Sequence, residues 1–289
     1  MSVLYRRPHL RPNAQVAFIA VGIVLILVGA TSNRARCAQE DIDAVPQTLS
    51  DTEDKGRDSA ADNVQDTSSD RQDTCDIKDK SGLAVLGLRE AVLHDPESIY
   101  VVVNKSHGID IDFEPQDLVE VHTYVACENN CLRKQAAEAF CEMYEQALKD
   151  DVHIGFGSGY RPGRYQQELW EGYRARYGEV RACEISAKGG YSEHQTGLCF
   201  DATEHTNSFD GINYTSEFAH TKTGIWLAEH SWEYGFILRY PEGYEDITGY
   251  TFEPWHYRYI GKKAAALYHK ENATTLEEFF HIQGGTEYT

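Results

Sequence analysis

The first 36 residues limit which part of this chain can form a globular domain. No charged residue lies between Arg11 and Arg34, and the centre of this stretch, Ala14–Ala30, is almost wholly apolar. A membrane-spanning helix needs about 20 mostly apolar residues, which this stretch nearly supplies. Basic residues precede it, so this end is predicted to stay in the cytoplasm. We therefore predict a cytoplasmic tail and membrane anchor over residues 1–36. The alternative is a cleaved signal segment, although the apolar run exceeds the usual ~7–15 residues.

Residues 37–80 have a different character, because 13 of them are acidic, five are basic and none is aromatic. Such a segment cannot bury enough apolar surface to offset the entropy lost on ordering. We predict an acidic, disordered linker over residues 37–80. Globular structure is thereby confined to residues 81–289, a length that suits one domain.

The chain as a whole is acidic, with a formal net charge of −19. Nucleic-acid binding requires clustered cations that contact phosphates, so this charge argues against a nucleic-acid partner. The seven cysteines form no Cys-x-x-Cys pair, which disfavours a structural zinc finger. In an exported chain Cys127 and Cys131 could form a disulfide, but unpaired buried thiols are an equally good interpretation.

Hydrophobic patterns predict a mixture of helices and short strands within residues 81–289. Apolar residues at three- and four-residue steps predict an amphipathic helix over Leu132–Asp150. Because helices and strands do not alternate regularly, the pattern favours an α+β fold over a parallel sheet. The other predicted helices are Arg164–Tyr177 and Ser216–Tyr234, and the predicted strands are Ser98–Lys105, His153–Arg161, Leu198–Ala202 and Phe236–Tyr240.

Three short motifs contain the residues that are best suited to metal binding and catalysis. They are SGYR at Ser158–Arg161, SEHQTGLCFD at Ser192–Asp201 and EPWH at Glu253–His256. A catalytic zinc site needs three ligands drawn from His and carboxylate side chains, an open position for water and a nearby base. His194, Asp201 and His256 could supply the ligands, with Glu253 as the base.

These motifs resemble the VanY-type D-alanyl-D-alanine carboxypeptidases of the LAS group of zinc peptidases. That family has a Ser-x-His, an Asp seven residues after the His, and a Glu-x-x-His near its end. The resemblance extends over roughly residues 98–280. It implies a single compact zinc-peptidase domain over residues 81–289, with a small antiparallel sheet flanked by helices, and a bound Zn²⁺ ion.

The resemblance also implies roles for individual residues. His194, Asp201 and His256 would hold the zinc ion, and Glu253 would act as general base. Arg161 matches the arginine that stabilises the developing oxyanion. Ser192 and Gln166 are candidates for binding the substrate's terminal carboxylate or backbone, which completes the predicted site.

The sequence departs from the family pattern at Pro162-Gly163, at Cys199 and in an unusual insert at Cys127–Cys131. Pro162-Gly163 follows Arg161 where relatives often have a Ser and an aromatic residue. Cys199 stands where the family commonly has a small apolar residue, and its neighbours Leu198 and Phe200 favour a core thiol over a metal ligand. None of these departures removes a predicted catalytic group.

The function predicted from this resemblance is a zinc-dependent D,D-carboxypeptidase that removes the C-terminal D-alanine from peptidoglycan stem peptides. One alternative is an L,D-carboxypeptidase acting on tetrapeptide stems, and another is an endopeptidase that cuts within the stem. A non-catalytic, zinc-containing module that binds the cell wall is disfavoured by the presence of both Glu253 and Arg161. The predicted location is the bacterial cell membrane, with a single span and an extracytoplasmic catalytic domain, or the exterior if the N-terminal segment is cleaved.

Overall fold

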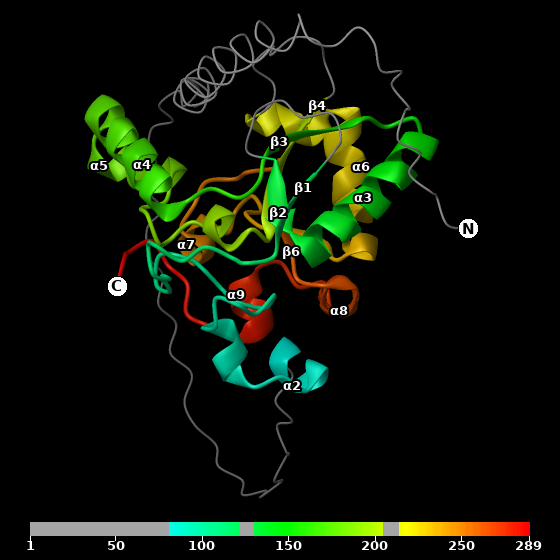
Figure 1. Ribbon diagram of the computed structural model, residues 1–289, viewed down its shortest axis with the longest axis horizontal. Coiled ribbons are helices and arrows are strands. Elements are labelled where there is room, and N and C mark those ends of the chain that lie inside the picture. Colours follow the sequence, from blue (N-terminus) through cyan, green and yellow to red (C-terminus); the bar gives the residue numbers. More distant parts are fainter. Residues whose placement is uncertain (1–80, 122–129, 205–213) are drawn as a thin grey trace, which may run out of the picture.

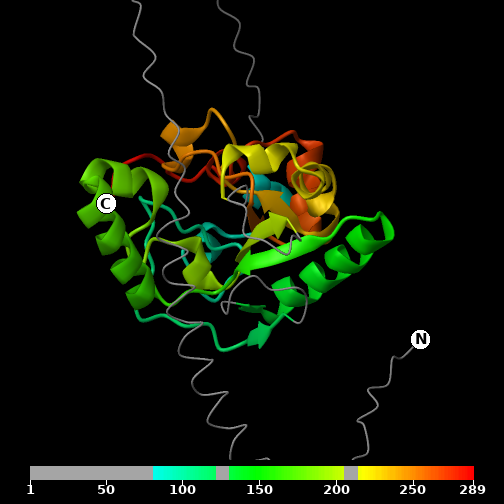
Figure 2. The ribbon, with the colours of Figure 1, turned by 90° about the horizontal axis from the view of Figure 1, so that it is seen from above.

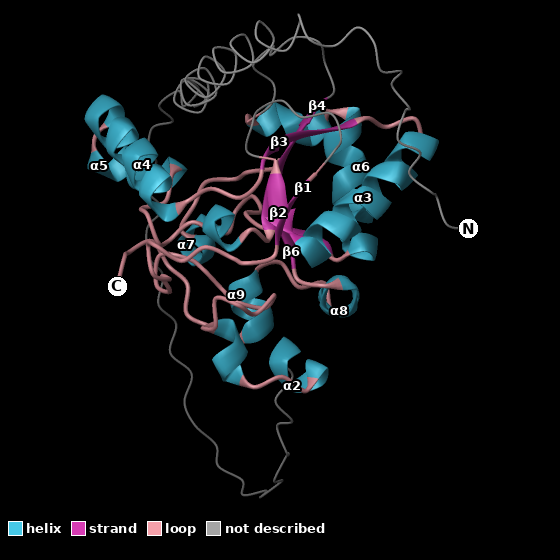
Figure 3. Cartoon of the chain, viewed as in Figure 1, coloured by secondary structure: helices cyan, strands magenta, loops and turns pink. Residues whose placement is uncertain are grey.

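The structure is a computed structural model that describes residues 81–121, 130–204 and 214–289 (Figure 1). The predicted anchor (1–36) and the predicted linker (37–80) lie outside the described residues, as do Cys37, Cys75 and Cys127. Within the described ranges, no helix is both long enough and apolar enough to cross a membrane. The predicted α+β class is confirmed, since helices surround two small antiparallel sheets (Figure 3).

The larger sheet has four strands in the order β3-β4-β6-β5, and every neighbouring pair is antiparallel. The smaller sheet pairs β1 with β2. The strands are β1 (Leu118–Glu120), β2 (Cys131–Arg133), β3 (Ile154–Ser158), β4 (Cys199–Glu204), β5 (Phe236–Leu238) and β6 (His256–Tyr259).

Helices lie on both sides of the larger sheet: α3 is on one side and α4 with α5 is on the other (Figures 1 and 2). The α-helices are α2 (Gly82–Leu86), α3 (Lys134–Lys149), α4 (Gly163–Tyr177), α5 (Glu179–Ile185), α6 (Lys222–His230), α7 (Glu245–Thr248), α8 (Lys262–Lys270) and α9 (Leu276–Phe280). The 3₁₀ helices are η1 (Glu90–Leu93), η2 (Glu193–Thr196), η3 (Ser216–His220) and η4 (Ser231–Tyr234).

Residue alternation along β4 separates the hydrophobic core from the polar face of the sheet. Successive strand residues point to opposite faces, so Phe200 and Ala202 share one face while Cys199 and Asp201 share the other. Phe200 and Ala202 belong to the main core, where the Phe200 ring packs edge-on against Phe140 of α3 with 4.8 Å between ring centroids. The face opposite this core is therefore the one that carries Asp201.

The predicted helix over Leu132–Asp150 is confirmed as α3, except that Leu132 and Arg133 belong to strand β2 and the helix begins at Lys134. Its buried residues, which include Phe140 and Met143, follow the predicted helical spacing. The predicted helix at Arg164–Tyr177 is confirmed as α4, and three of the predicted strands correspond to β3, β4 and β5.

The prediction of a strand over Ser98–Lys105 is wrong. Val101, Val102 and Val103 are buried as expected, but this segment joins no sheet and forms only an isolated bridge between Asn104 and His107. An arginine side chain replaces the missing strand partner, because the Arg258 guanidinium donates hydrogen bonds to the carbonyl oxygens of Ile99 and Val101. The apolar run at Val101–Val103 therefore indicates that these residues are buried, but it does not indicate that they pair with a strand.

The prediction of one continuous helix over Ser216–Tyr234 is also wrong, because the segment divides into η3, α6 and η4. Thr221 adopts an extended conformation between the first two helices, and its side chain accepts a hydrogen bond from the Gly224 amide. This threonine caps a new helix and so prevents η3 from continuing into α6.

A buried network of charged side chains connects η2, β6, α9 and the residue that follows β5. Glu193 accepts hydrogen bonds from Arg239 (2.9 Å) and Arg258 (2.7 Å), and Arg239 makes a two-point contact with Glu277 at 2.9 and 2.7 Å. Arg239 and Glu193 have fully buried side chains. Because each charge has a partner of opposite sign, the removal of one member leaves another charge buried without full compensation.

We expect Glu277→Ala to lower the free energy of unfolding by about 3–5 kcal/mol, because Arg239 would lose its two-point partner inside the core. Chemical denaturation of the purified variant measures this change. The matched control is Glu278→Ala on the exposed side of the same helix, which should cost at most about 1 kcal/mol. Equal losses in the two variants would contradict the proposed contribution of the buried network.

Candidate active site

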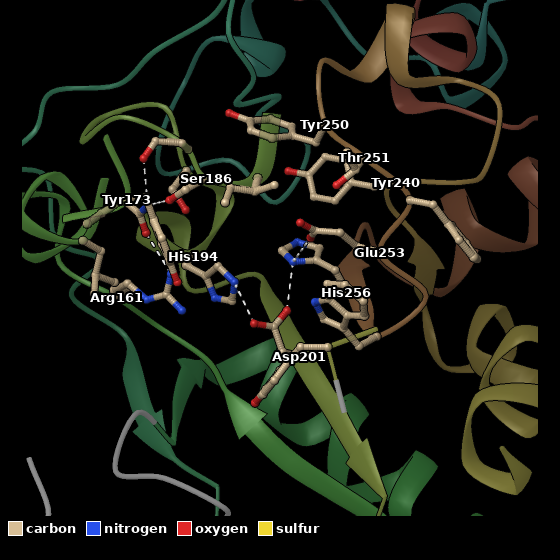
Figure 4. Close-up of a pocket in the computed structure, with 18 of the residues that line it drawn as sticks. Arg161, Tyr173, Ser186, His194, Asp201, Tyr240, Tyr250, Thr251, Glu253 and His256 are labelled. Atoms are coloured by element: carbon tan, nitrogen blue, oxygen red, sulfur yellow. Dashed lines mark hydrogen bonds and ion pairs between the residues drawn. The ribbon is translucent and has the colours of Figure 1, made fainter. Parts of the chain in front are cut away.

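A cavity of about 290 Å³ lies on the polar face of the larger sheet. Such a volume is close to the lower end of the usual range for small-molecule sites, about 300–1,000 Å³. All of the predicted site residues line it: Arg161, Gln166, Ser192, His194, Asp201, Glu253 and His256. The structure therefore brings together side chains from β4, β6, η2, α4 and the connecting loops (Figure 4).

The two predicted imidazole ligands lie on either side of Asp201. His194 Nε2 is 3.2 Å from Asp201 Oδ2, and His256 Nδ1 is 3.0 Å from Asp201 Oδ1. The antiparallel register explains this arrangement, because Asp201 on β4 and His256 on β6 are direct partners across the sheet. His194 comes from η2, which ends at Gly197 in a left-handed conformation just before β4. The three side chains point toward one another (Figure 4).

Polar groups on the far sides of the imidazole rings orient them. His194 Nδ1 donates to the Gly159 carbonyl oxygen at 2.7 Å, so Nε2 is the nitrogen that faces Asp201. His256 Nε2 points toward Glu193 Oε2 at 3.6 Å, which leaves Nδ1 facing Asp201. Carbonyl and carboxylate groups placed behind imidazoles commonly fix the orientation of histidine ligands.

The donor set fits a bound transition-metal ion. His194 Nε2 and His256 Nδ1 both face the buried carboxylate of Asp201, at 3.2 and 3.0 Å. Two imidazole nitrogens and a carboxylate are the donors that a catalytic zinc site uses. Ligand atoms of His194, Cys199 and His256 also lie within 4.8 Å of one another. Asp201 and Cys199 are therefore both close to the pair of imidazoles.

The two acidic residues in the cavity have opposite environments. Burial alone favours the protonated form of Asp201, but His194 and His256 outweigh it and hold the pKa of this carboxyl group well below its usual range. Burial raises the pKa of Glu253 to about 7, although His256 opposes this shift. An anionic carboxylate suits a ligand, whereas a carboxyl group that titrates near neutral pH suits proton transfer. Glu253 Oε2 lies 3.8 Å from His256 Nδ1, beside the histidine pair.

Arg161 is held against the same cavity by side chains from two elements. Its Nη1 donates to Gln166 Oε1 at 2.8 Å, and its Nη2 donates to Ser158 Oγ at 3.0 Å. Gln166 is fixed in turn, because its Nε2 donates to Ser186 Oγ and to the Ala187 carbonyl oxygen. These contacts favour a role for Gln166 in positioning Arg161.

Several residues of the site were not identified from the sequence. Glu193 stands behind His256, and Tyr240 and Tyr250 form part of the cavity wall, with 5.0 Å between their ring centroids. Glu193 lies within the SEH motif, so its position next to a predicted ligand was the available signal. No comparable signal marked the two tyrosines, which reach the cavity through the loops after β5 and α7.

Comparisons with known proteins agree with this geometry. The family model described as VanY, D-alanyl-D-alanine carboxypeptidase, matches residues 129–262. YodJ of Bacillus subtilis (strain 168), described as a carboxypeptidase, is 36% identical over 267 residues, which cover 90% of this chain and 93% of YodJ.

Two solved structures extend the likeness to three dimensions. The LdcB LD-carboxypeptidase matches with a TM-score of 0.60 and 39% identity, over 64% of this chain and 87% of that one. A mutant of the vancomycin resistance D,D-pentapeptidase VanY, in complex with Zn(II), matches with a TM-score of 0.51 and 30% identity, over 62% of this chain and 97% of that one. These similarities in sequence and structure show that the chain belongs to the VanY family of D-alanyl-D-alanine carboxypeptidases.

Proposed function

We propose that this protein is a zinc-dependent carboxypeptidase that removes the C-terminal D-alanine from peptidoglycan stem peptides. The observation that carries the proposal is the convergence of His194, Asp201 and His256 beside Glu253 and Arg161 in one cavity. The Zn(II) complex of the VanY relative supports the choice of metal ion.

His194 Nε2, His256 Nδ1 and the Asp201 carboxylate would hold the ion. When bound, zinc acts as a Lewis acid and lowers the pKa of a coordinated water molecule toward ~7. Glu253 would accept the proton from the attacking water and then deliver it to the departing amine, a use that fits its raised pKa. Arg161 would donate hydrogen bonds to the oxygen on which negative charge develops.

The D,D reaction, on a pentapeptide ending in D-Ala-D-Ala, is the specificity predicted from the sequence. The L,D reaction on a tetrapeptide stem is a second candidate, and one observation favours it. The LD-carboxypeptidase LdcB is more similar to this chain (39% identity) than the D,D-pentapeptidase VanY (30% identity). The two reactions share the same metal site and differ in the residue that precedes the released D-alanine.

Digestion of defined stem peptides tests the proposal and separates the two specificities. The purified, zinc-loaded protein should release one alanine from either the pentapeptide or the tetrapeptide, as measured by mass spectrometry of the products. A substrate with an amidated C-terminus should resist cleavage, whereas an endopeptidase would cut it. If neither stem peptide loses alanine, the proposed function is wrong.

We expect Arg161→Ala to lower kcat by about 10²–10³-fold, because the developing oxyanion would lose its charged donor. Steady-state kinetics on the preferred stem peptide measures this change, and zinc content should stay at the wild-type level. Arg164→Ala is the matched control, since that arginine lies three positions further along the chain, is exposed in the first turn of α4 and pairs with Asp112. A normal kcat in Arg161→Ala would show that another group stabilises the oxyanion.

We also propose that residues 1–36 anchor the protein in the bacterial membrane, with the catalytic domain on the outer side. The uncharged, apolar stretch at Ala14–Ala30 supports this location. Cell fractionation of the full chain, next to a form that lacks residues 1–36, tests it. Recovery of the full chain in the soluble fraction would contradict an uncleaved anchor.

A further inference from the structure

Tyr288 stands behind the candidate active-site cavity and contacts both of its walls. One wall follows α5 and includes Ser186, whereas the other precedes β6 and includes Tyr250 and Thr251. Ser186 lies on one side of the cavity, and Tyr250 and Thr251 lie on the other (Figure 4). The two walls are far apart in the chain, so their separation depends on contacts between them.

The first wall contacts Tyr288 through its backbone and through two side chains. The Lys188 amide donates a hydrogen bond to Tyr288 Oη at 3.1 Å, and Lys188 Nζ lies over the same ring, 4.5 Å from its centroid. The Tyr191 ring packs edge-on against it at 5.0 Å. Lys188 follows Ser186 by two positions and Tyr191 directly precedes Ser192, and both serines line the cavity. Tyr288 is therefore fixed to this wall.

The second wall contacts Tyr288 through a buried lysine. Lys105 Nζ lies 5.7 Å from the centroid of the Tyr288 ring and 4.8 Å from that of the Tyr250 ring. The same ammonium group donates a hydrogen bond to the carbonyl oxygen of Gly249, which directly precedes Tyr250. Lys105 is only 2% exposed, so these protein groups take the place of water around its charge. Lys105 thus connects Tyr288 to the wall that carries Tyr250.

The Tyr288 ring lies close to two positive charges, one from each wall. The face of an aromatic ring is negative and attracts cations within about 6 Å, whereas two ammonium groups repel each other. Burial lowers the pKa of Lys105, and the nearby charge of Lys188 acts in the same direction. The ring therefore offsets a repulsion that would otherwise favour a wider separation of the walls.

One backbone hydrogen bond crosses directly between the two walls. The Thr251 amide donates to the carbonyl oxygen of Glu184, near the end of α5, at 3.3 Å. This distance lies beyond the usual range for such bonds, about 2.7–3.2 Å, so this bond alone is a weak connection. The contacts of Tyr288 are then the stronger link between the walls.

We propose that Tyr288 is a positioning residue that holds the two cavity walls at the separation at which the stem peptide binds. The inference rests on the proposed function for the identity of that substrate. If only a fraction of the molecules has the correct separation, the apparent affinity for substrate falls by that fraction. The bound peptide restores the separation, so a loss of Tyr288 contacts should raise KM and change kcat little.

Tyr288→Leu tests the proposal, because leucine keeps apolar bulk but lacks an aromatic face. In the full chain, acting on the preferred stem peptide, we expect KM to rise about 5–30-fold while kcat stays within about twofold and zinc content is unchanged. Tyr288→Phe keeps the ring and should stay within about threefold of the wild-type KM. Thr286→Ala, an exposed position in the same segment, is the matched control and should equal the wild type. A wild-type KM in Tyr288→Leu would overturn the proposal.

Lys188→Met supplies a readout that a purely structural role for Tyr288 would not produce. In the Tyr288→Leu background this change removes one of the two like charges, so KM should fall by at least about threefold instead of rising further. The KM defect of Tyr288→Leu should also shrink at high ionic strength, because salt screens the repulsion. A higher KM in the double variant than in Tyr288→Leu would overturn the proposal.

Hydrogen exchange measures the separation of the walls without any substrate. Peptides that contain the Thr251 amide should exchange at least about tenfold faster in Tyr288→Leu than in the wild type, and at the wild-type rate in Thr286→Ala. Unchanged exchange in Tyr288→Leu would overturn the inference and leave the proposed function intact. Faster exchange in a protein that releases no alanine would support control of the walls by Tyr288 and refute the proposed function.

Discussion

Glu253→Gln is expected to abolish measurable turnover while zinc content stays at the wild-type level. Glutamine keeps the size of the side chain but cannot accept a proton from water, so both proton transfers assigned to Glu253 would be lost. General acid–base catalysis contributes about 10²–10⁴-fold, and we expect kcat to fall toward the upper end because one residue performs both steps. Single-turnover assays on the preferred stem peptide, with metal analysis of the same sample, measure the two quantities.

The exposed Glu242, in the loop after β5, supplies a matched control. Glu242→Gln makes the same chemical change outside the cavity, so its kcat and zinc content should both match the wild type. Retained turnover in Glu253→Gln would refute the assignment of the base. Loss of zinc from this variant would instead assign Glu253 to the ligand set, a result that its 3.8 Å distance from His256 makes worth measuring.

The placement of the candidate ligands could be predicted from the sequence because the family motifs fix residue types at fixed spacings. Asp201 and His256 are 55 positions apart in the chain, yet antiparallel pairing of β4 and β6 makes them direct neighbours. His194 and Asp201 are seven positions apart, and they lie on η2 and on the strand β4 that follows it. What the sequence alone could not supply was the pairing of those strands, which depends on contacts far apart in the chain.

The two errors in the fold prediction have different physical causes. An apolar run such as Val101–Val103 reports burial, but several backbone arrangements satisfy burial equally well. The Arg258 side chain takes the place of a neighbouring strand by donating hydrogen bonds to this segment. No local sequence pattern near Ser98 predicts these hydrogen bonds. The helix expected over Ser216–Tyr234 failed for a local reason, since the capping threonine at position 221 was visible in the sequence.

The largest feature that the sequence analysis did not predict is the network of buried charges behind the site. Burial opposes ionisation of Glu193, yet Arg239 and Arg258 outweigh it and hold the pKa of this carboxyl group well below its usual range. Glu277 of α9 completes this network, so the last helix is connected to the side chain that stands behind His256. Charged residues in a sequence usually predict surface, and here their partners lie 38–65 positions away along the chain.

His194→Ala is expected to remove metal ion and activity together. The substitution deletes one of two imidazole donors and leaves Asp201 without the contact at 3.2 Å, so the remaining donors should hold zinc far more weakly. Metal analysis after gel filtration should show substoichiometric zinc, and alanine release from the stem peptide should fall to background. The wild type treated with a chelator should behave in the same way and should recover when zinc is restored, whereas the variant should not.

His220→Ala is the matched control, because His220 is an exposed imidazole on η3. It should keep full zinc content and normal turnover, which would show that the loss in His194→Ala depends on the position of the imidazole. Circular dichroism and thermal unfolding in the presence of excess chelator separate loss of the ion from loss of the fold, since metal-free wild type and His194→Ala should then match. Wild-type zinc content in His194→Ala would show that the ligand set is wrong, and with it the claim that η2 and the paired strands β4 and β6 build a hydrolytic metal site.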